Sequence, residues 1–433
     1  MKAENEMAIT PVARSRRGWS LLPSEATSDA GILIAARGVR AFGDGFVSVL
    51  LPVYLTDLGY SGVRIGAIST ATLVGSAALT LLVGLFAYRW RQRRLLIAAT
   101  LLMITTGVGF TVVHAFWPLM LVALIGTLNP SAGDVSVFLP LEQTLIPQTV
   151  SDRQRTSLFA RYSLIASLIG AAGALFAGVP GIVADHSAIS LRHLFQATFL
   201  LYGLLAVIAL LLYRRLSPAV EREAHAVATP LKESKRIVYT LAALFSLDSL
   251  GDGFVVQSLL ALWLFNRFDL SVATAATIFF WSGVFSALSY LVAVRLADRF
   301  GLVKTMVFTH LPAQIALILT PFMPSLWLAI VLLMIRAMLS QMDIPTRNSY
   351  VMAIVTPAER PAAASVTSVP RSLASASTPL LSGYLLGLST FGWPLVICGV
   401  LKSTYDLLTL ALFSKIKPPE ELTPVHPAAI VDA

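Results

Sequence analysis

Two aspartates stand in repeated motifs inside stretches that are otherwise apolar. Asp44 lies in Gly43–Val47 (Gly-Asp-Gly-Phe-Val), and Asp252 lies in the identical sequence at Gly251–Val255. An ionised side chain at the centre of a bilayer costs about 2.5–3.5 kcal/mol even on a lenient insertion scale, so it persists where it faces protein or a wet cavity. Loss of water favours the neutral form of a carboxylate, and a nearby arginine favours the ionised form. The two residues therefore predict a proton-binding cavity, with Asp44 as the first candidate carrier and Asp252 as the second.

Further charges lie within the same kind of apolar stretch and share helical faces. Arg336, Asp343 and Arg347 are separated by seven and four residues, a spacing that puts them on one face of a helix. Acids with aromatic neighbours would suit an amphipathic or cationic solute, whereas Arg336 and Arg371 equally permit an organic anion. The alternative is that each acid only neutralises a neighbouring arginine. The predicted cavity residues are Asp44, Asp134, Asp252, Asp343, Arg336 and Arg371.

The charged residues belong to a sequence that repeats itself. Pro140 returns as Pro345, 205 residues later, and Glu142 aligns with Arg347 at the same offset. Duplicated membrane halves commonly build a central site at their interface. Opposite charges at equivalent positions then predict an ion pair between the halves, formed by Glu142 and Arg347 on the cytoplasmic side.

The composition places most of the chain in lipid. Of 433 residues, 56% are hydrophobic and 13% are charged, and the mean hydropathy is +0.76. A soluble protein carries about 25% charged residues, and about 20 apolar residues cross a bilayer as a helix. Twelve such stretches predict an all-α membrane protein with twelve transmembrane helices. The net charge of +9 comes from short basic clusters between apolar runs, which argues against nucleic-acid binding. Six histidines without ligand spacing indicate no metal site, and no cofactor is expected.

The basic residues also predict the topology. Most lysines and arginines outside the apolar stretches fall on the side of the two termini, and only Arg64, Arg192 and Arg267 fall on the other. Cytoplasmic loops carry such an excess, so both termini are expected in the cytoplasm, below a plasma or inner membrane. The expected organisation is a cytoplasmic tail (1–30), a six-helix bundle (31–213), a cytoplasmic linker (214–237), a second six-helix bundle (238–414) and a disordered tail (415–433).

The loop after the second apolar stretch of each half carries the most specific motif. Leu296–Gly301 reads Leu-Ala-Asp-Arg-Phe-Gly, and Gly84–Arg89 reads Gly-Leu-Phe-Ala-Tyr-Arg with further arginines behind it. With six apolar stretches, a basic linker and six more, the chain resembles the major facilitator superfamily, whose loop reads Gly-x-Leu-Ala-Asp-Arg-x-Gly-Arg-Lys. The resemblance implies cytoplasmic gating loops that latch the outward-open state, although Tyr88 replaces the acid of the first copy. The residues concerned are Gly84, Arg89, Arg93, Asp298, Arg299 and Gly301.

Glycine and proline gather in the fifth and eleventh apolar stretches. Small residues let membrane helices approach closely, and a Gly-Pro pair can bend a helix. This pattern is similar to part of the fifth-helix motif of the superfamily's drug–proton antiporters, and ordinary helix packing is the alternative. The packing or bending residues are Gly178, Pro180, Gly181, Pro379 and Gly383.

The resemblance implies a secondary active transporter that works by alternating access. The expected activity is proton-coupled efflux of a small organic solute, carried out by a monomer in the lipid bilayer. Proton-coupled uptake is an alternative, and so is a non-transporting sensor or scaffold on the same fold. The sequence lacks the Gly-x-x-x-x-Gly-Lys-Ser/Thr loop that binds ATP phosphates. No nucleophile–base constellation indicates an enzyme.

Overall fold

The computed structural model describes residues 26–86, 91–129, 136–150, 155–217, 231–355 and 359–414, and in these ranges no strand occurs. We call Ser28–Arg214 the N-terminal repeat and Lys235–Phe413 the C-terminal repeat. The helices of the N-terminal repeat are α1 (Ser28–Asp57), α2 (Gly62–Phe86), α3 (Gln92–Val112), α4 (Phe116–Ile125), α5 (Phe138–Leu145), α6 (Arg155–Phe176), α7 (Val179–His186) and α8 (Leu191–Arg214). Those of the C-terminal repeat are α9 (Lys235–Phe254), α10 (Gln257–Phe268), α11 (Val272–Phe300), α12 (Leu302–Leu319), α13 (Leu326–Ser340), α14 (Asp343–Ile354), α15 (Arg360–Ser377), α16 (Pro379–Leu388) and α17 (Trp393–Phe413).

The outer surfaces of the helices are apolar enough to face lipid. In the described part, nine helical stretches are long and apolar enough to cross a membrane. Trp117 and Trp327 stand near the starts of α4 and α13 and are 71% and 76% exposed, as expected for tryptophans at a membrane–water interface. The protein is therefore an all-α, multi-pass membrane protein. The count of twelve spans and the division into two six-helix bundles stay predictions.

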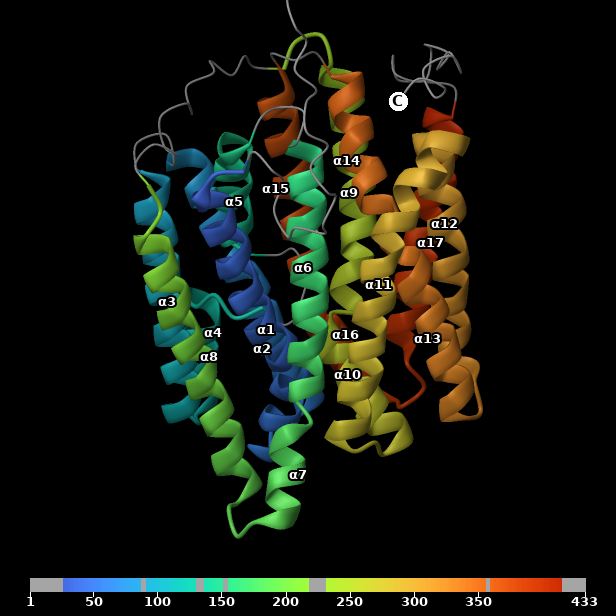
Figure 1. Ribbon diagram of the computed structural model, residues 1–433. Helices are drawn as coiled ribbons and strands as arrows, with labels where there is room; N and C mark the ends of the chain where they lie inside the picture. Colours follow the sequence, from blue (N-terminus) through green and yellow to red (C-terminus); the bar gives the residue numbers. More distant parts are fainter. Residues whose placement is uncertain are drawn as a thin grey trace, which may run out of the picture.

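The two repeats use the same helix neighbours. In the N-terminal repeat α1 packs against α6 and α8, and in the C-terminal repeat α9 packs against α15 and α17. Likewise α3 packs on α8 as α12 packs on α17, and α2 on α4 as α11 on α13. Figure 1 shows the blue-to-green helices mainly on the left and the yellow-to-red helices mainly on the right. The sequence repeat is thus a repeat of packing.

The glycines of the repeated Gly-Asp-Gly motif are explained by this packing. A Cβ atom added at Gly45 would lie 2.1 Å from the carbonyl oxygen of Gly170 in α6, and one at Gly253 would lie 2.1 Å from that of Ser375 in α15. At the preceding glycine of each motif, a Cβ atom added at Gly43 would lie 2.9 Å from the ring of Tyr202 in α8, and one added at Gly251 would lie 3.0 Å from the side chain of Lys402 in α17. Real Cβ atoms do not approach backbone so closely, so only glycine lets α1 and α9 pack between their neighbours.

The glycine- and proline-rich stretches are each divided into two helices. Pro180 lies in the first turn of α7 and Pro379 in the first turn of α16, where a missing N–H leaves no hydrogen bond unmade. Gly178 lies between α6 and α7, and an added Cβ there would be 3.0 Å from Ala273 of α11. Nothing lies within 4 Å of a Cβ added at Gly181. Gly178 therefore serves close packing between the repeats, whereas Gly181 does not.

Main chain meets main chain where α2 of one repeat touches α16 of the other. A Cβ added at Gly383 would lie 2.4 Å from the carbonyl oxygen of Gly62 and 2.8 Å from the Cα of Gly66. Near this contact, which we call the glycine seam, Gln257 of α10 donates a hydrogen bond of 2.8 Å to Ser48 of α1. The two repeats are therefore joined at this level by glycine contacts and a polar contact between side chains.

Candidate functional site

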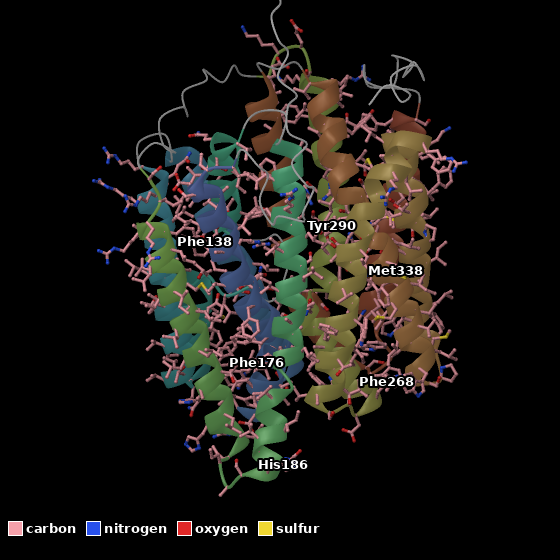
Figure 2. All side chains as sticks on the ribbon, in the orientation of Figure 1. Phe138, Phe176, His186, Phe268, Tyr290 and Met338 are labelled. Carbon is pink, nitrogen blue, oxygen red and sulfur yellow. The ribbon has the colours of Figure 1, made fainter. Side chains whose placement is uncertain are left out.

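A fully buried ion pair lies inside the N-terminal repeat. The guanidinium of Arg40 in α1 pairs with the carboxylate of Glu142 in α5, and the two side chains are 1% and 0% exposed. The hydroxyls of Tyr162 and Tyr213 also donate to Glu142, the latter at 2.5 Å. The Arg40 guanidinium lies 4.1 Å from the ring centroid of Phe138, which Figure 2 labels in the upper part of this repeat. Because the charge is paired and hydrogen-bonded, its burial is tolerated.

A longer chain of ion pairs lies inside the C-terminal repeat. Lys402 of α17 contacts Asp248 at 2.7 Å and Asp252 at 2.8 Å, both on α9. Arg347 of α14 contacts Asp248 and Asp343, each at 3.1 Å. The order along this C-repeat chain is Asp252, Lys402, Asp248, Arg347 and Asp343. Three helices that are distant in sequence are thus joined by charge.

Asp252 is the member of the C-repeat chain that is not buried. Its side chain is 46% exposed, whereas those of Lys402 and Asp248 are 5% and 2% exposed. It lies near the middle of the apolar stretch Lys235–Phe268. An exposed, ion-paired carboxylate at this depth indicates contact with water, because contact with lipid would be costly.

Asp44 occupies a different environment from its counterpart Asp252. It is 7% exposed and hydrogen-bonded to the side chain of Asn129. The ring of Tyr202 packs against Gly43 just as the side chain of Lys402 packs against Gly251. Tyrosine therefore stands in the N-terminal repeat where the C-terminal repeat has the lysine that pairs with Asp252.

The predicted ion pair between Glu142 and Arg347 is absent from the ion pairs of the described residues. Each residue is paired inside its own repeat, Glu142 with Arg40 and Arg347 with Asp248. Asp248 follows Arg40 by 208 residues, the offset of the Gly-Asp-Gly motif, and Arg347 follows Glu142 by 205. The same ion pair therefore occurs once in each repeat with its polarity reversed. In this structure Glu142 and Arg347 are thus paired within their own repeats, and an ion pair between them stays a prediction.

Two predicted cavity arginines have no carboxylate partner among the described ion pairs. The Nε of Arg371 donates to the hydroxyl of Ser249 at 3.2 Å, and its guanidinium lies 5.9 Å from the Phe245 ring centroid. The buried Nε of Arg336 has no hydrogen-bond partner in the described part of the chain. Both side chains are half-buried. Asp134 lies outside the described residues.

The sequence reasoning missed a polar pair behind the C-repeat chain. His310 of α12 contacts Asp406 of α17 through Nδ1 at 2.9 Å, and its Nε2 lies 2.9 Å from the amide nitrogen of Gln314. The His310 and Asp406 side chains are 3% and 1% exposed. The signal available in the sequence was the four-residue spacing of Lys402 and Asp406, and of His310 and Gln314, on two apolar helices.

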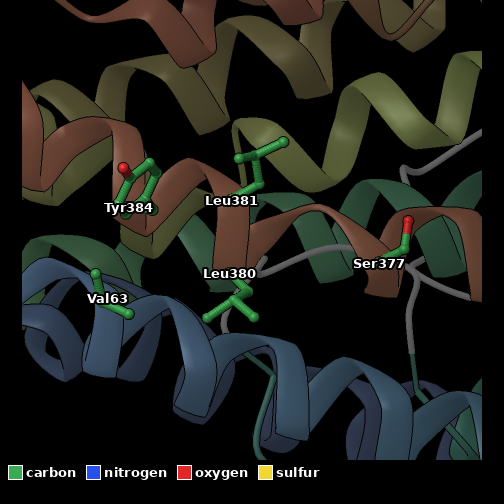
Figure 3. Close-up of a pocket in the computed structure, with 5 residues that line it drawn as sticks. All are labelled: Val63, Ser377, Leu380, Leu381 and Tyr384. Carbon is green, nitrogen blue, oxygen red and sulfur yellow. The ribbon is translucent and has the colours of Figure 1, made fainter.

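A surface groove lies at the glycine seam, away from these charges. Figure 3 shows the side chains that line it, which come from α2, α15 and α16. Tyr384, Leu380 and Leu381 there are 49%, 43% and 47% exposed. A mostly apolar groove with such exposure is suited to lipid rather than to proton chemistry, so the ion-paired networks are the better candidate site.

Comparison with known proteins identifies the family. The model of the Major Facilitator Superfamily matches residues 33–265 and again residues 241–430. The chain belongs to the Major Facilitator Superfamily. The superfamily chain is 23% identical over 423 residues to the uncharacterized membrane protein YJR124C of Saccharomyces cerevisiae, covering 90% of this chain and 94% of the relative.

Solved structures support the same fold. A POT family transporter in complex with a thioalcohol-conjugated peptide aligns with a TM-score of 0.68 at 15% identity, covering 88% of this chain and 95% of that one. The nucleoside transporter NupG aligns with a TM-score of 0.67 at 15% identity, covering 89% and 99%. These likenesses show the fold. The match to the family model shows that this superfamily member is a membrane transporter rather than an enzyme.

The gating loops of the superfamily are only partly described. Gly84 lies in the last turn of α2, and Asp298 and Arg299 lie in the last turn of α11. Gly301 joins α11 to α12 with φ of 87°, a backbone conformation that glycine adopts most readily. Arg93 donates to the carbonyl oxygen of Arg214 and so ties α3 to the end of α8. Arg89 lies outside the described residues, and the latch stays a prediction.

Proposed function

We propose that this superfamily member exports a small organic solute by alternating access in exchange for protons. The observation that carries the proposal is the half-exposed carboxylate of Asp252, ion-paired to buried Lys402 in the middle of a membrane-spanning stretch. A scaffold or sensor gains nothing from the cost of placing this charge at such a depth.

The environment of Asp252 suits a group that gains and loses a proton. Its carboxylate is half-exposed and contacts the ammonium of Lys402, and closing the cavity over it would remove the water from its exposed side. If Asp252 is neutral, Lys402 loses that ion pair and keeps the one with Asp248. The protonation state would thus change the charge that the cavity presents to the solute.

Asp44 is proposed as the corresponding site of the N-terminal repeat, second in rank to Asp252. Its burial and its hydrogen bond to Asn129 separate it from the exposed position of Asp252. The glycines beside it are explained by helix packing, so the repeated motif no longer argues for Asp44 as the first carrier.

The cavity arginines favour a solute with an acidic group. Arg371 and Arg336 are half-buried, and neither has a carboxylate partner in the described part of the chain. Such a guanidinium can bind a carboxylate or a phosphate by donating two parallel hydrogen bonds to it. Asp343, which is buried and paired with Arg347, supports the cavity wall rather than the solute. We further propose a monomer with both termini in the cytoplasm of a plasma or inner membrane.

Transport in proteoliposomes tests this function. The full-length protein would be offered uridine, a dipeptide and an aromatic organic anion, each radiolabelled, with and without a pH gradient. We expect the anion to accumulate against its own gradient only when protons move the other way, and a protonophore to abolish this. Accumulation that is indifferent to the pH gradient for every probe would refute proton coupling.

A single substitution tests the assignment to Asp252. Asp252→Asn should keep exchange of the anion across the membrane at equilibrium and lose accumulation driven by the pH gradient. Asp57→Asn is the matched control, because Asp57 forms an exposed ion pair of 2.9 Å with Arg192. Full proton-driven accumulation by Asp252→Asn would overturn the assignment.

A further inference from the structure

The buried pair of His310 and Asp406 has no counterpart in the N-terminal repeat. Trp117 and Trp327 are equivalent residues and lie 210 positions apart in the sequence. With the same offset between α3 and α12, Thr100 of α3 is the equivalent of His310. Gly43 contacts Tyr202 of α8, and Gly251 contacts Lys402 of α17. Equivalent positions of α8 and α17 are therefore 200 residues apart in the sequence, so Ala206 is the equivalent of Asp406.

In the N-terminal repeat α3 packs on α8 as α12 packs on α17 in the C-terminal repeat, but with no ionisable group at these two positions. Among the described residues, the hydroxyl of Thr100 donates to the carbonyl oxygens of Leu96 and Ile97 in its own helix, and Ala206 is 0% exposed. Burying a histidine and an aspartate at this interface adds a desolvation cost that packing does not require. The extra pair in the C-terminal repeat calls for another reason.

Gln314 can satisfy His310 in both of its protonation states. In the present arrangement the amide nitrogen of Gln314 faces Nε2 of His310, and the amide oxygen is buried without a hydrogen-bond partner among the described residues. A half-turn of the amide would bring that oxygen to Nε2, where it would accept from the second N–H of an imidazolium. The site thus holds an acceptor ready for one more proton.

The charges around the pair favour a cation on His310. Facing it are Lys402 and Tyr405 of α17, Asp343 of α14 and Asp248 of α9. The C-repeat chain has three carboxylates for two cations, and among the described residues Asp406 is paired with His310. An imidazolium there would balance Asp406 and one excess negative charge would remain.

We propose that His310 and Asp406 together store the coupling proton of the C-terminal repeat. This rests on the proton-coupled transport proposed above. Asp252 exchanges protons with the cavity water, and His310 holds one proton on Nε2 while Nδ1–H stays donated to Asp406. The pair then changes its charge from minus one to zero and returns the same proton to water on the other side. Lys402 lies one helical turn from Asp406 and contacts Asp252. The charge of the His310–Asp406 pair therefore acts through Lys402 on the charge that faces the cavity.

Nuclear magnetic resonance of the full-length protein in lipid nanodiscs, with ¹⁵N-labelled histidine, tests the storage site without any solute. His310→Gln would identify the His310 signals by their loss. We expect His310 to pass between imidazole and imidazolium within about pH 5–8, and Asp406→Asn to move this transition to lower pH because the imidazolium loses its counter-ion. A His310 that keeps one protonation state over that range in the folded protein overturns the proposal.

A variant built from the residues of the other repeat tests the role in transport. The double variant His310→Thr, Asp406→Ala introduces the two residues that pack at the equivalent positions of the N-terminal repeat. We expect this double variant to exchange the radiolabelled anion as fast as the original chain but to lose its proton-driven accumulation, whereas His193→Gln, an exposed control, changes neither. Unchanged proton-driven accumulation in the double variant refutes the storage role. If the original chain itself shows no proton-driven accumulation, the proposed function fails, and the resonance titration still decides whether the pair binds a proton.

Discussion

Arg40 in α1 and Asp248 in α9 occupy equivalent positions in the two repeats and carry opposite charges. Each is ion-paired, Arg40 with Glu142 and Asp248 with Arg347, and these partners are equivalent to each other as well. The first helix of one repeat thus carries the cation and the first helix of the other carries the anion. The same ion pair, between α1 and α5 in one repeat and between α9 and α14 in the other, exists here in both polarities.

This relationship predicts that the polarity of the N-terminal pair can be reversed. Arg40→Glu or Glu142→Arg alone should destabilise the protein by about 3–5 kcal/mol, because each leaves buried charge without a partner. The double variant should recover part of that loss, though not all, since Tyr162 and Tyr213 donate to Glu142 and could not donate to an arginine. Denaturant unfolding in detergent would measure the three free energies.

The exposed pair of Asp57 and Arg192 is the control for the reversal. Its side chains are 33% and 51% exposed, so charge changes there should alter stability by about 0–1 kcal/mol. A double variant of Arg40 and Glu142 that is no more stable than the worse single variant would contradict the interpretation.

Lys402 should matter more for stability than its exposed partner. Lys402→Met removes the cation between Asp248 and Asp252 and should cost about 3–5 kcal/mol. Asp252→Asn should cost less, because Asp252 is half-exposed and Lys402 keeps its contact with Asp248. Thermal melts of the purified variants, with exposed Lys304→Met as the control, would rank them. The opposite ranking would show that the exposed carboxylate of Asp252, not the buried ammonium of Lys402, governs the stability of this cluster.

The second glycine of each repeated motif should tolerate no side chain. Gly45→Ala and Gly253→Ala would each place a methyl group 2.1 Å from a backbone carbonyl oxygen, and overpacking of this kind costs about 1–3 kcal/mol. Gly181→Ala is the control, since its added methyl group meets open space. The yield of folded protein and its melting temperature are the measurements. Equal values for Gly45→Ala and Gly181→Ala would refute the close approach of α1 and α6.

Glu359, which contacts the residues at the start of α9, should make stability depend on pH. It accepts hydrogen bonds from the backbone N–H groups of Lys232, Glu233 and Ser234, and these bonds, that of Lys232 first, lower the pKa of Glu359 to about 2. An unfolded chain has a glutamate pKa of about 4.3. The folded state therefore gains stability above that value and loses it as the pH falls towards 2.

Melting temperatures over a range of pH would test this dependence. The difference between the original chain and Glu359→Gln should be constant above about pH 5 and shrink below about pH 4.3. A difference that is constant down to pH 3 would mean that the carboxylate is not held in its ionised form by the three N–H groups.

The sequence was sufficient for the class of fold because apolar length, basic loops and a motif are local signals. It also predicts Asp252, Arg371 and Arg347 within membrane-spanning segments, and Asp252 does lie in a helical stretch that is long and apolar enough to cross a membrane. It could not assign partners to them. Residues at equivalent positions of a repeat are related by the symmetry of the fold and meet only near its axis, so the alignment of Glu142 with Arg347 established equivalence and not contact.

The remaining members of the site were hidden for a related reason. His310 and Asp406 are 96 residues apart, and no short-range pattern joins two positions on helices that pack only in the folded state. The repeated motif favours Asp44 as the first proton carrier, yet the repetition is explained by what the flanking glycines contact. A repeated motif can thus record a constraint on the backbone while the residue at its centre varies in environment.

The glycine seam between α2 and α16 has a consequence for motion. Gly62, Gly66 and Gly383 present no side chains to one another, so nothing is interlocked there. At these three positions the two helices can part or slide without a side chain having to change its rotamer, and the carbonyl groups exposed in this way already have partners within their own helices. The glycine seam therefore opposes rocking of one repeat on the other less than interdigitated large aliphatic side chains would.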